Sequence, residues 1–330
     1  MIISQTPLRI SLAGGGTDLP CYCSRRQGKV LSTAVNKYIF VIIQERFDDQ
    51  IHVNYARRKE VVDEVSQVRH DLAREAMRMA GLVRGFEVTT LADIPSEGSG
   101  LGSSSALTVG LLNAFHAYRG RQVDAETLAR QACEIEIVRC GKPIGRQDQY
   151  IAAYGGLHFF TFHKDGSVGM KRVDVQDHVL RRLEAGLLLY YTNKTRSADG
   201  ILAEARLRAA DNLAVMNGIR ALAEESHSAL LRGDVDSVGR NLDRGWRLKK
   251  RLAAGVTDPG IDAFYARARR AGAIGGRITG AGGGGFFLLY APELRRARLR
   301  KSLSGFRELP IELEPGGSKI VLNIRRRIWR

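Results

Sequence analysis

The sequence predicts an α+β protein made of two packed domains that meet near residue 180. At 330 residues the chain is too long for one small domain. Strand-like and helix-like segments alternate up to about residue 180, and longer helical segments follow. Neither an internal repeat nor a low-complexity linker separates the two parts, so we expect them to pack directly against each other.

The first half contains several strand-like and three helix-like segments. β-Branched and aromatic residues predict a strand over Tyr38–Phe47, followed by a hairpin turn at Asp48-Asp49 and an alternating strand over Ile51–Tyr55. Further strands are expected over Ile2–Leu12, Phe86–Leu91, Gly156–Phe162 and Val168–Val173, the last two as a hairpin. Helices are expected over 65–79, with Gly81 as the stop, and over Ser104–Tyr118 and Asp124–Cys140.

The second half begins with a buried-looking strand over Leu187–Thr192. Helices are expected from about Ala198 to Leu231, over Val235–Trp246, and after Asp258-Pro259, where Asp caps and Pro occupies the first turn. Strands over Ile274–Ile278 and Phe286–Tyr290 flank a glycine run, and Ile311–Leu313 with Lys319–Ile324 should form a last hairpin around Pro315-Gly316-Gly317.

The composition is that of a soluble globular protein with an excess of positive charge. Hydrophobic residues make up 44% and charged residues 26% of the chain, and 51 Lys and Arg face 35 Asp and Glu, for a net charge of +16. This charge suits nucleic acid, a membrane surface or anionic substrates. The densest clusters, Arg295–Lys301 and Arg325–Arg330, are interpreted as solvated surface.

Cysteine usage and hydropathy indicate the cellular compartment. Cys21, Cys23, Cys133 and Cys140 form no C-x-x-C pair, and no histidine pair has zinc spacing, so free thiols in a reducing compartment are expected. The N-terminus lacks the features of a signal peptide. No apolar run approaches the roughly 18–20 residues needed to span a bilayer. We therefore expect a cytoplasmic protein without a membrane or nucleic-acid partner.

A Gly- and Ser-rich segment, Pro95–Leu107, lies between a predicted strand and a predicted helix. Its glycines permit tight turns and close approach of a ligand to the backbone. Its serines supply hydroxyls at the helix start, where free N–H groups and the helix dipole favour an anion such as a triphosphate. The residues expected to surround the phosphates are Gly98, Gly100, Leu101, Gly102, Ser103, Ser104 and Ser105.

Other phosphate-binding or catalytic loops fit this segment less well. The G-x-x-x-x-G-K-[ST] motif of P-loop proteins is absent, as are the H-R-D and D-F-G signatures of protein kinases. The stretch Gly102–Ala106 is one residue away from the G-x-S-x-G nucleophile elbow, so a serine hydrolase with Ser104 as nucleophile remains an alternative. It would need a histidine base, and none of His158, His163, His178 and His227 has an obvious orienting acid.

Two further glycine runs flank this segment in the sequence. Gly14-Gly15-Gly16 follows the first predicted strand. Gly280–Gly285 formally matches the dinucleotide fingerprint, but a strand follows it where that fingerprint requires a helix. A glycine run between two strands instead predicts backbone packed closely against a ligand or another loop.

Together the three runs resemble the motifs of the GHMP kinase family. The matching segments are PLRISLAGGGTD at Pro7–Asp18, the run Pro95–Ala106 and the run Thr279–Gly285. Within the family, GGGTDLP at Gly14–Pro20 and PIGRQDQYIAAYGG at Pro143–Gly156 are similar to the heptose 7-phosphate kinases. The resemblance implies an ATP-binding α/β domain with a mixed sheet over 1–180 and a ferredoxin-like α+β domain over 181–330.

The resemblance also implies the residues that act on ATP. Ser104 and Glu136 match the Mg²⁺ partners of the family, with Glu134 as the alternative to Glu136. Asp148 matches the aspartate that faces the acceptor hydroxyl, and Arg9 matches a basic residue beside it. Whether this aspartate is a base or an electrostatic stabiliser stays open. Kinases of this kind act mainly by positioning reactants and neutralising charge.

Acceptor-binding residues are implied in the same way. Asp18 matches the sugar-binding carboxylate, which can accept hydrogen bonds from two adjacent hydroxyls. The other residues expected at the acceptor are Gly15, Gly16, Thr17, Thr195, Arg196, Gly282 and Gly283. Candidates for a distal phosphate are Arg25, Arg26, Lys29 and Lys37.

The sequence thus predicts a sugar kinase that uses ATP and Mg²⁺. The expected reaction converts D-glycero-D-manno-heptose 7-phosphate to the 1,7-bisphosphate, and the expected state is a monomer or homodimer. The alternatives are a 1-kinase for an octose 8-phosphate, mannose or fucose, and a basic nucleic-acid-binding module. Because no stacking aromatics alternate with the basic clusters, the last is disfavoured.

Overall fold

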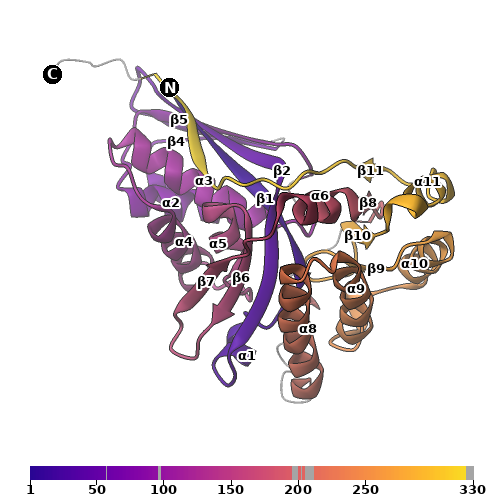
Figure 1. The fold of residues 1–330 in the computed structure, drawn as a ribbon. Helices are drawn as coiled ribbons and strands as arrows, with labels where there is room; N and C mark the ends of the chain where they lie inside the picture. Colours follow the sequence, from indigo (N-terminus) through magenta and orange to yellow (C-terminus); the bar gives the residue numbers. More distant parts are fainter. Residues whose placement is uncertain (57, 96–97, 195–199, 202, 205–211, 325–330) are drawn as a thin grey trace.

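The computed structural model of the protein describes residues 1–56, 58–95, 98–194, 200–201, 203–204 and 212–324. The chain forms two units that lie side by side, each with a sheet and packed helices (Figure 1). This arrangement confirms the predicted α+β class.

The first unit is built on a mixed eight-stranded sheet. Its strands are β1 (Ile2–Ala13), β2 (Gly28–Glu45), β3 (Ile51–Tyr55), β4 (Arg58–Val62), β5 (Phe86–Ala92), β6 (Leu157–Phe162), β7 (Val168–Arg172) and β12 (Lys319–Asn323). The main path runs β12-β1-β2-β5-β3-β4, while β6 and β7 continue from the first half of β2. Strands β3 and β5 are parallel, whereas the other pairs are antiparallel.

Two features of this sheet differ from the prediction. Strand β2 begins at Gly28, ten residues before the expected start at Tyr38, because consecutive residues such as Leu31 and Ser32 are buried on both faces and no alternation shows. The predicted hairpin between β2 and β3 is wrong. Strand β5 lies between them, and β3 forms its hairpin with β4.

Helices of the first unit pack against one face of this sheet (Figure 1). They are α2 (Asp71–Ala80), α3 (Ser103–Tyr118), α4 (Ala125–Cys133) and α5 (Gln147–Tyr154). The short helix α1 (Pro20–Cys23) follows the first glycine run, and α6 (Asp177–Gly186) packs against β8 and α9. Residues 65–67 form a separate 3₁₀ turn, η1 (Val65–Gln67), so the predicted helix from Val65 starts six residues late. His70 caps α2 by accepting a hydrogen bond from the Ala73 N–H. Gly81 ends α2 in the left-handed conformation, as expected.

The predicted helix Asp124–Cys140 contains a change of helix type. Helix α4 ends at Cys133, and a π-helical segment, η2 (Glu134–Arg139), follows. A π turn carries one residue more per hydrogen-bonded ring than an α turn, which shifts the direction of every side chain after it.

The second unit contains a four-stranded antiparallel sheet in the order β11-β8-β10-β9. Its strands are β8 (Leu187–Tyr191), β9 (Gly275–Ile278), β10 (Phe286–Tyr290) and β11 (Glu308–Leu309). Its helices are α8 (Leu213–Leu231), α9 (Val235–Lys249), η3 (Ala254–Val256), α10 (Pro259–Ala271) and α11 (Glu293–Ser302). As predicted, the Asp258 side chain caps α10. The expected helix start near Ala198 lies outside the described residues.

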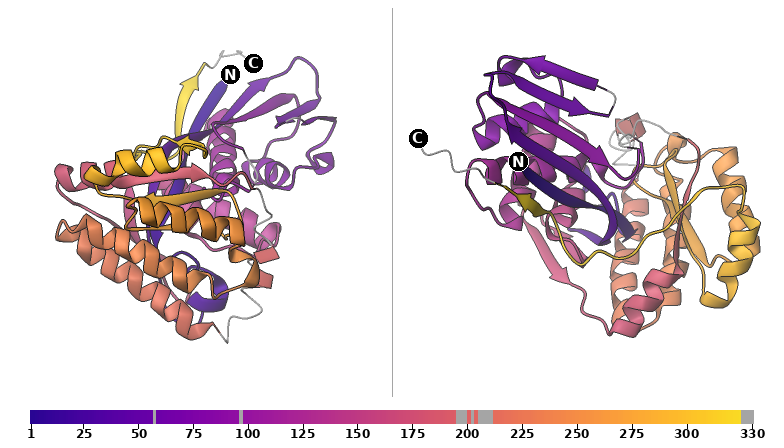
Figure 2. Two further views of the ribbon diagram at one scale, coloured as in Figure 1. Left: turned by 90° about the vertical axis from the view of Figure 1, so that its right-hand side faces the viewer. Right: turned by 90° about the horizontal axis from the view of Figure 1, so that it is seen from above.

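The predicted C-terminal hairpin is wrong. Strand β12 pairs antiparallel with β1, with Ile2 opposite Asn323, so the chain returns to the sheet of the first unit (Figure 2). Gly317, one of the glycines that suggested a turn, instead lets this segment pass close to the backbone at the end of α5. A Cβ on Gly317 would lie 2.0 Å from the Ala153 carbonyl oxygen at the end of α5.

The two units share one hydrophobic core. Helix α8 packs against β1 and β2 on the face opposite α2–α5, and its Ala223 joins the buried cluster that contains Leu12 and Leu31. A second cluster, between the smaller sheet, α10 and α11, contains Trp246, Phe264 and Phe287. The shared core fixes the junction at which the glycine runs meet.

Candidate active site

The second and third glycine runs pack against each other at this junction. The Phe286 N–H donates to the Ser99 carbonyl at 3.2 Å. A Cβ on Gly280 would lie 2.6 Å from the Gly100 Cα, and a Cβ on Gly285 would lie 2.5 Å from the Ser99 oxygen. The third run is therefore backbone packed against another loop, as its flanking strands predicted.

The second glycine run leaves a helix start open to a ligand. Gly98, Gly100 and Gly102 have φ values of 68°, 74° and 77°, a region that favours glycine. Helix α3 follows directly, with no side chain capping its first turn. The first N–H groups of a helix have no partner within it, so those of α3 can bind an anion. Ser103 stays within the loop, since its hydroxyl shares a 2.8 Å hydrogen bond with that of Ser99.

A buried carboxylate lies beside this helix start. Glu136 accepts hydrogen bonds from the hydroxyls of Ser104 at 2.6 Å and Ser105 at 2.7 Å, and from the Gln149 amide at 2.5 Å. Burial raises the pKa of Glu136, while the serine hydrogen bonds act in the opposite direction. The Lys142 ammonium donates to the Ser104 hydroxyl at 3.1 Å, on the exposed side of the cluster.

The π-helical segment decides which glutamate faces this cluster. Glu134, the alternative from the sequence, points outward and pairs with Arg139 at 2.6 Å. Glu136 points inward and is fully buried. A π turn inside a helical region is frequent at functional sites, and here it places one carboxylate on each side.

The Glu136 cluster fits a hydrated Mg²⁺ carried by a phosphate chain. It offers one carboxylate and the accessible Ser104 hydroxyl, both hard oxygen donors. No group of three or more His, Cys, Asp or Glu with metal-binding geometry occurs in the described part of the chain. Mg²⁺ commonly keeps waters and phosphate oxygens as most of its ligands, so two protein groups are sufficient.

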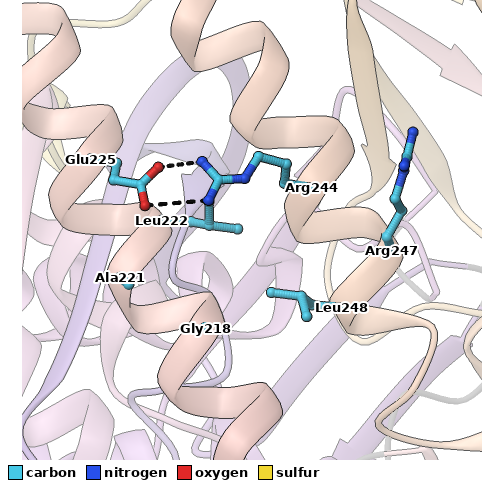
Figure 3. Close-up of a pocket in the computed structure, with 7 residues that line it drawn as sticks. All are labelled: Gly218, Ala221, Leu222, Glu225, Arg244, Arg247 and Leu248. Atoms are coloured by element: carbon cyan, nitrogen blue, oxygen red, sulfur yellow. Dashed lines mark hydrogen bonds and ion pairs between the residues drawn. The ribbon is translucent and has the colours of Figure 1, made fainter.

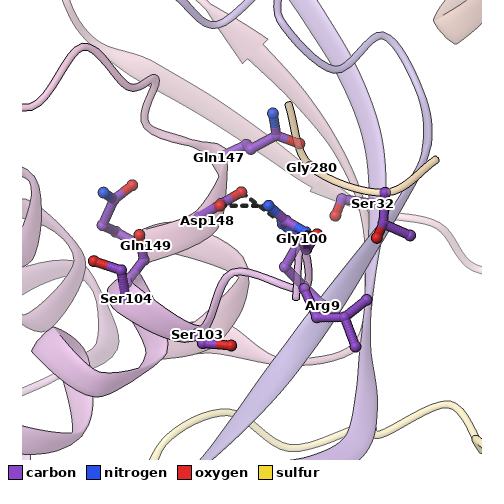
Figure 4. A network of polar contacts seen from close by, with 12 residues as sticks. Arg9, Ser32, Gly100, Ser103, Ser104, Gln147, Asp148, Gln149 and Gly280 are labelled. Carbon is purple, nitrogen blue, oxygen red and sulfur yellow. Dashed lines mark hydrogen bonds and ion pairs between the residues drawn. The ribbon is translucent and has the colours of Figure 1, made fainter. Parts of the chain in front are cut away.

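Arg9 and Asp148 form a bidentate ion pair near the start of α3 (Figure 4). The Nε–Oδ1 distance is 2.6 Å and the Nη2–Oδ2 distance is 2.5 Å. Arg9 also donates through Nη1 to the Gly100 carbonyl at 2.7 Å, which ties the pair to the second glycine run. Two parallel charge-assisted hydrogen bonds fix the plane of the carboxylate as well as its position.

Asp18 is a buried carboxylate close to the Arg9–Asp148 pair. Its oxygens accept hydrogen bonds from the Gly16 N–H at 3.1 Å, the Gln147 N–H at 3.2 Å and the Gln147 side-chain amide at 2.9 Å. Burial raises the pKa of Asp18, and the nearby Asp148 charge raises it further. Gly145 is required here, because a Cβ on it would lie 1.9 Å from Asp18 Oδ2.

Comparison with known proteins identifies the family. The model of the GHMP kinase N-terminal domain matches residues 65–156, and that of the C-terminal domain matches residues 226–306. A D-glycero-alpha-D-manno-heptose 7-phosphate kinase from Campylobacter jejuni is 31% identical over 318 residues, which cover 92% of this chain and 93% of the relative. The chain belongs to the GHMP kinase family. It is accordingly a phosphotransferase of that family.

Two further relatives place this GHMP kinase among sugar kinases. A D-glycero-D-manno-heptose 1-phosphate kinase from Bacteroides thetaiotaomicron superposes with a TM-score of 0.82 at 27% identity, covering 98% of this chain and 100% of the other. An L-fucokinase/L-fucose-1-P guanylyltransferase from Bacteroides fragilis is 27% identical over 345 residues, 92% of this chain and 36% of that protein.

Several residues predicted at the acceptor have other bonding roles in this GHMP kinase. The Thr17 hydroxyl donates to the carbonyls of Gly14 and Lys29, both at 2.9 Å, and so holds the first glycine run. The Gly283 N–H donates to the Val256 carbonyl, so this N–H already has a hydrogen-bond partner within the protein. Gly15 and Gly16 line the first run beside Asp18. The roles of Gly15, Gly16, Thr17, Gly282 and Gly283 toward substrate stay predictions, and Thr195 and Arg196 lie outside the described residues.

The basic residues suggested for a distal phosphate lie toward the surface. Arg25 and Arg26 are exposed, and Lys37 is half-buried. Lys29 lies 3.5 Å from Glu224 and over the ring of Phe159. These environments are those of surface charges.

The sequence analysis did not predict four polar residues that the fold places near Asp18, Glu136 or Arg9. Gln147 and Gln149 flank Asp148 in the sequence, and their amides hold Asp18 and Glu136. Their position on either side of a predicted site aspartate was the available signal. Lys249 and Arg277 stand in no motif that indicates a site, yet both side chains are buried near Arg9.

A pocket of about 340 Å³ lies elsewhere, on the outer surface of α8 and α9 (Figure 3). It is lined by Gly218, Ala221, Leu222, Glu225, Arg244, Arg247 and Leu248. Arg244 is neutralised there by a two-point ion pair with Glu225. The pocket contains none of the glycine runs or carboxylates of the cleft and is not the candidate active site.

The alternative of a serine hydrolase has no support in this geometry. The Ser104 hydroxyl bonds to Glu136 and Lys142, and no histidine is among its partners in the described ranges. Within those ranges, no helix has the length and apolar character required to cross a bilayer.

Proposed function

We propose that this GHMP kinase transfers the γ-phosphoryl group of ATP to the anomeric hydroxyl of D-glycero-D-manno-heptose 7-phosphate, giving the 1,7-bisphosphate. The observation that carries the proposal is the ion pair of Arg9 with Asp148, linked through adjacent Gln147 to Asp18 and through Gly100 to the open start of α3. A hydroxyl acceptor and a phosphate donor can thus be bound side by side.

Each chain residue has a defined task in this mechanism. The N–H groups at the start of α3 bind the phosphates of ATP. Asp18 accepts hydrogen bonds from adjacent sugar hydroxyls and orients the ring. Asp148 accepts a hydrogen bond from the attacking hydroxyl, while Arg9 keeps its carboxylate in plane. As the acceptor oxygen bonds to the γ-phosphorus, the bond from that phosphorus to the β,γ-bridging oxygen breaks and ADP leaves, while the hydroxyl proton moves to an Asp148 oxygen.

Mg²⁺ would be held by Glu136 and Ser104, together with phosphate oxygens and water. Its chemistry is to neutralise charge on the phosphates. The remaining contacts of Glu136, to Ser105 and Gln149, orient the carboxylate whether or not the ion is present.

The names of the relatives differ in the position of the acceptor phosphate. One is called a heptose 7-phosphate kinase and the other a heptose 1-phosphate kinase. The assay therefore has to identify the product as well as the rate. Phosphorus NMR of the product distinguishes a new phosphate at the anomeric carbon from one at the terminal carbon.

The direct test is a substrate panel. The protein is incubated with ATP and Mg²⁺ and with heptose 7-phosphate, heptose 1-phosphate, an octose 8-phosphate, mannose or fucose, and ADP release is followed. The expected result is the highest kcat/KM with heptose 7-phosphate and a 1,7-bisphosphate product. Absence of sugar-dependent ADP release with the whole panel would reject the proposal. If kcat/KM is higher with fucose than with heptose 7-phosphate, fucose is the acceptor in place of the heptose, in line with the fucokinase relative.

A further inference from the structure

Arg277 is a buried cation without a counterion. It lies on β9, just before the third glycine run, and is 5% exposed. Its Nε is buried with no hydrogen-bond partner, and no ion pair of its guanidinium occurs among the described residues. Burial of an unpaired charge is costly, so such a group normally has a partner that the protein alone does not supply.

The surroundings of Arg277 add positive charge. Lys249 is 6% exposed, and its ammonium donates to the carbonyls of Ile278 and Gly280. Burial and then Arg9 lower the pKa of Arg277 to about 10, and burial and then Arg277 lower the pKa of Lys249 well below its usual value. Asp148 neutralises Arg9 only. Within the described chain, Lys249 and Arg277 have no carboxylate partner.

The Arg277 guanidinium lies beside Gly15, in the first glycine run. A Cβ on Gly15 would lie 3.3 Å from Arg277 Nη2, 3.1 Å from Ser11 Oγ and 3.7 Å from Gln147 Nε2. Ser11 Oγ and Gln147 Oε1 are also buried without a partner in the described structure. Arg277, Ser11 and Gln147 each carry a buried polar atom without a partner among the described residues, and all three side chains lie around Gly15. Gln147 also donates to Asp18.

We propose that Arg277 binds a phosphoryl group beside Gly15, at the acceptor end of the candidate active site. The inference rests on the proposed function only for the identity of the sugar. A phosphoryl group supplies the missing negative charge, and a guanidinium can bind two of its oxygens. This group is either the phosphate that the acceptor carries or the phosphoryl group in transfer, since both present the same oxygens.

The binding test uses inorganic phosphate as the probe. ADP is kept saturating so that the second glycine run is occupied, and phosphate is titrated by calorimetry and by thermal melting into wild type, Arg277→Met, Arg277→Lys and the exposed control Arg121→Met. Phosphate should raise the Tm of wild type and of the control and leave that of Arg277→Met unchanged. Arg277→Lys should retain weakened binding.

A structural role would give a different pattern. Without phosphate, Arg277→Met should melt no lower than wild type, because an apolar side chain replaces an uncompensated buried charge. A lower Tm combined with an undiminished phosphate response would overturn the proposal.

Kinetics with two acceptors identify the source of the phosphoryl group. If Arg277 binds the acceptor phosphate, Arg277→Met raises KM roughly 10- to 100-fold for heptose 7-phosphate and leaves an unphosphorylated sugar unaffected. If Arg277 binds the group in transfer, kcat falls by a similar factor with both acceptors. Unchanged kinetics with both would reject the assignment. A wild type that phosphorylates no sugar rejects the proposed function, while the phosphate titration still tests Arg277.

Discussion

Arg9 and Asp148, 139 residues apart in the chain, are joined by two parallel hydrogen bonds of 2.6 and 2.5 Å. Arg9 comes from the middle of β1 and Asp148 from the first turn of α5. The pair therefore links β1 and, through Gly100, the second glycine run to the helix that carries Gln147 and Gln149. Movement of either element would displace the carboxylate from the acceptor.

Replacement of Asp148 by Asn should remove catalysis and spare nucleotide binding. The amide cannot take a proton from the acceptor hydroxyl, and it loses one of the two bonds to Arg9. We expect kcat to fall roughly 100-fold or more, with the Kd for ATP unchanged. Steady-state kinetics and nucleotide titration measure the two effects. Asp174→Asn, at an exposed site, serves as the control, and a wild-type kcat for Asp148→Asn would remove Asp148 from the mechanism.

Replacement of Gly145 by Ala should impair acceptor binding through Asp18. The new Cβ would lie 1.9 Å from Asp18 Oδ2, so the carboxylate has to leave its bonds to Gln147. We expect KM for the sugar to rise roughly tenfold or more with little change in the Kd for ATP. Gly305→Ala is the matched control, because a Cβ there meets nothing within 4 Å. Equal kinetics for the two variants would contradict the role of Gly145.

Ser104 and Ser105 both bond to Glu136, yet their replacement by Ala should have different effects. Ser105 is buried, so Ser105→Ala leaves a buried carboxylate oxygen with one donor fewer and should lower the free energy of unfolding by about 1–3 kcal/mol. Ser104 is exposed, so Ser104→Ala should mainly raise the Mg²⁺ concentration needed for half-maximal activity. Urea unfolding and Mg²⁺ titration of the rate compare them. Identical profiles would argue against Ser104 as a metal partner.

The buried Asp18 predicts a distinct pH dependence of stability. Its pKa is raised above the ordinary 3.8, so the folded protein binds this proton more tightly than the unfolded chain. Ionised Asp18 therefore costs stability at neutral pH, and the cost is relieved as pH falls through the raised pKa. The Tm of Asp18→Asn relative to wild type should be most favourable at neutral pH and should decline as the pH falls through the raised pKa of Asp18. A difference that grows toward acid would contradict this sign.

The same raised pKa should appear in the kinetics. Asp18 binds sugar hydroxyls best as a carboxylate, so kcat/KM should decrease in mild acid, at a pH above the ordinary 3.8. The profile of kcat against pH at saturating sugar should show a smaller decrease. A kcat/KM that stays constant down to about pH 4 would show that Asp18 does not control acceptor binding.

Much of the fold could be predicted because local patterns determine it. The helix caps at Asp258 and Gly81 and the alternating strand over Ile51–Tyr55 are where the sequence placed them. The pairing of the strands was harder to predict from the sequence. The partner of β3 is set by contacts with β5 about thirty-five residues later in the chain, for which a short pattern carries no information.

The site residues show a similar division. Asp18, Asp148 and Ser104 stand in motifs and could be predicted as site residues, and the structure connects them through hydrogen bonds of Gln147, Gln149 and Glu136. Glu136 was preferred over Glu134 only on the family resemblance, because the direction of each side chain depends on a π turn that no residue type indicates. The burial of Arg277 could not be predicted from the local sequence, because arginine is ordinarily a surface residue and this burial results from long-range packing.

The return of β12 to β1 has a consequence for how the protein is made. Strand β1 is translated before the other strands described here, but its outer neighbour β12, which places Asn323 opposite Ile2, is translated only after the smaller sheet. Until then one edge of β1 exposes unpaired backbone groups, a state open to pairing with other chains. Folding of the first sheet is thus complete only when the second unit has been synthesised, so a stalled or shortened chain should aggregate even though most of its catalytic residues are present.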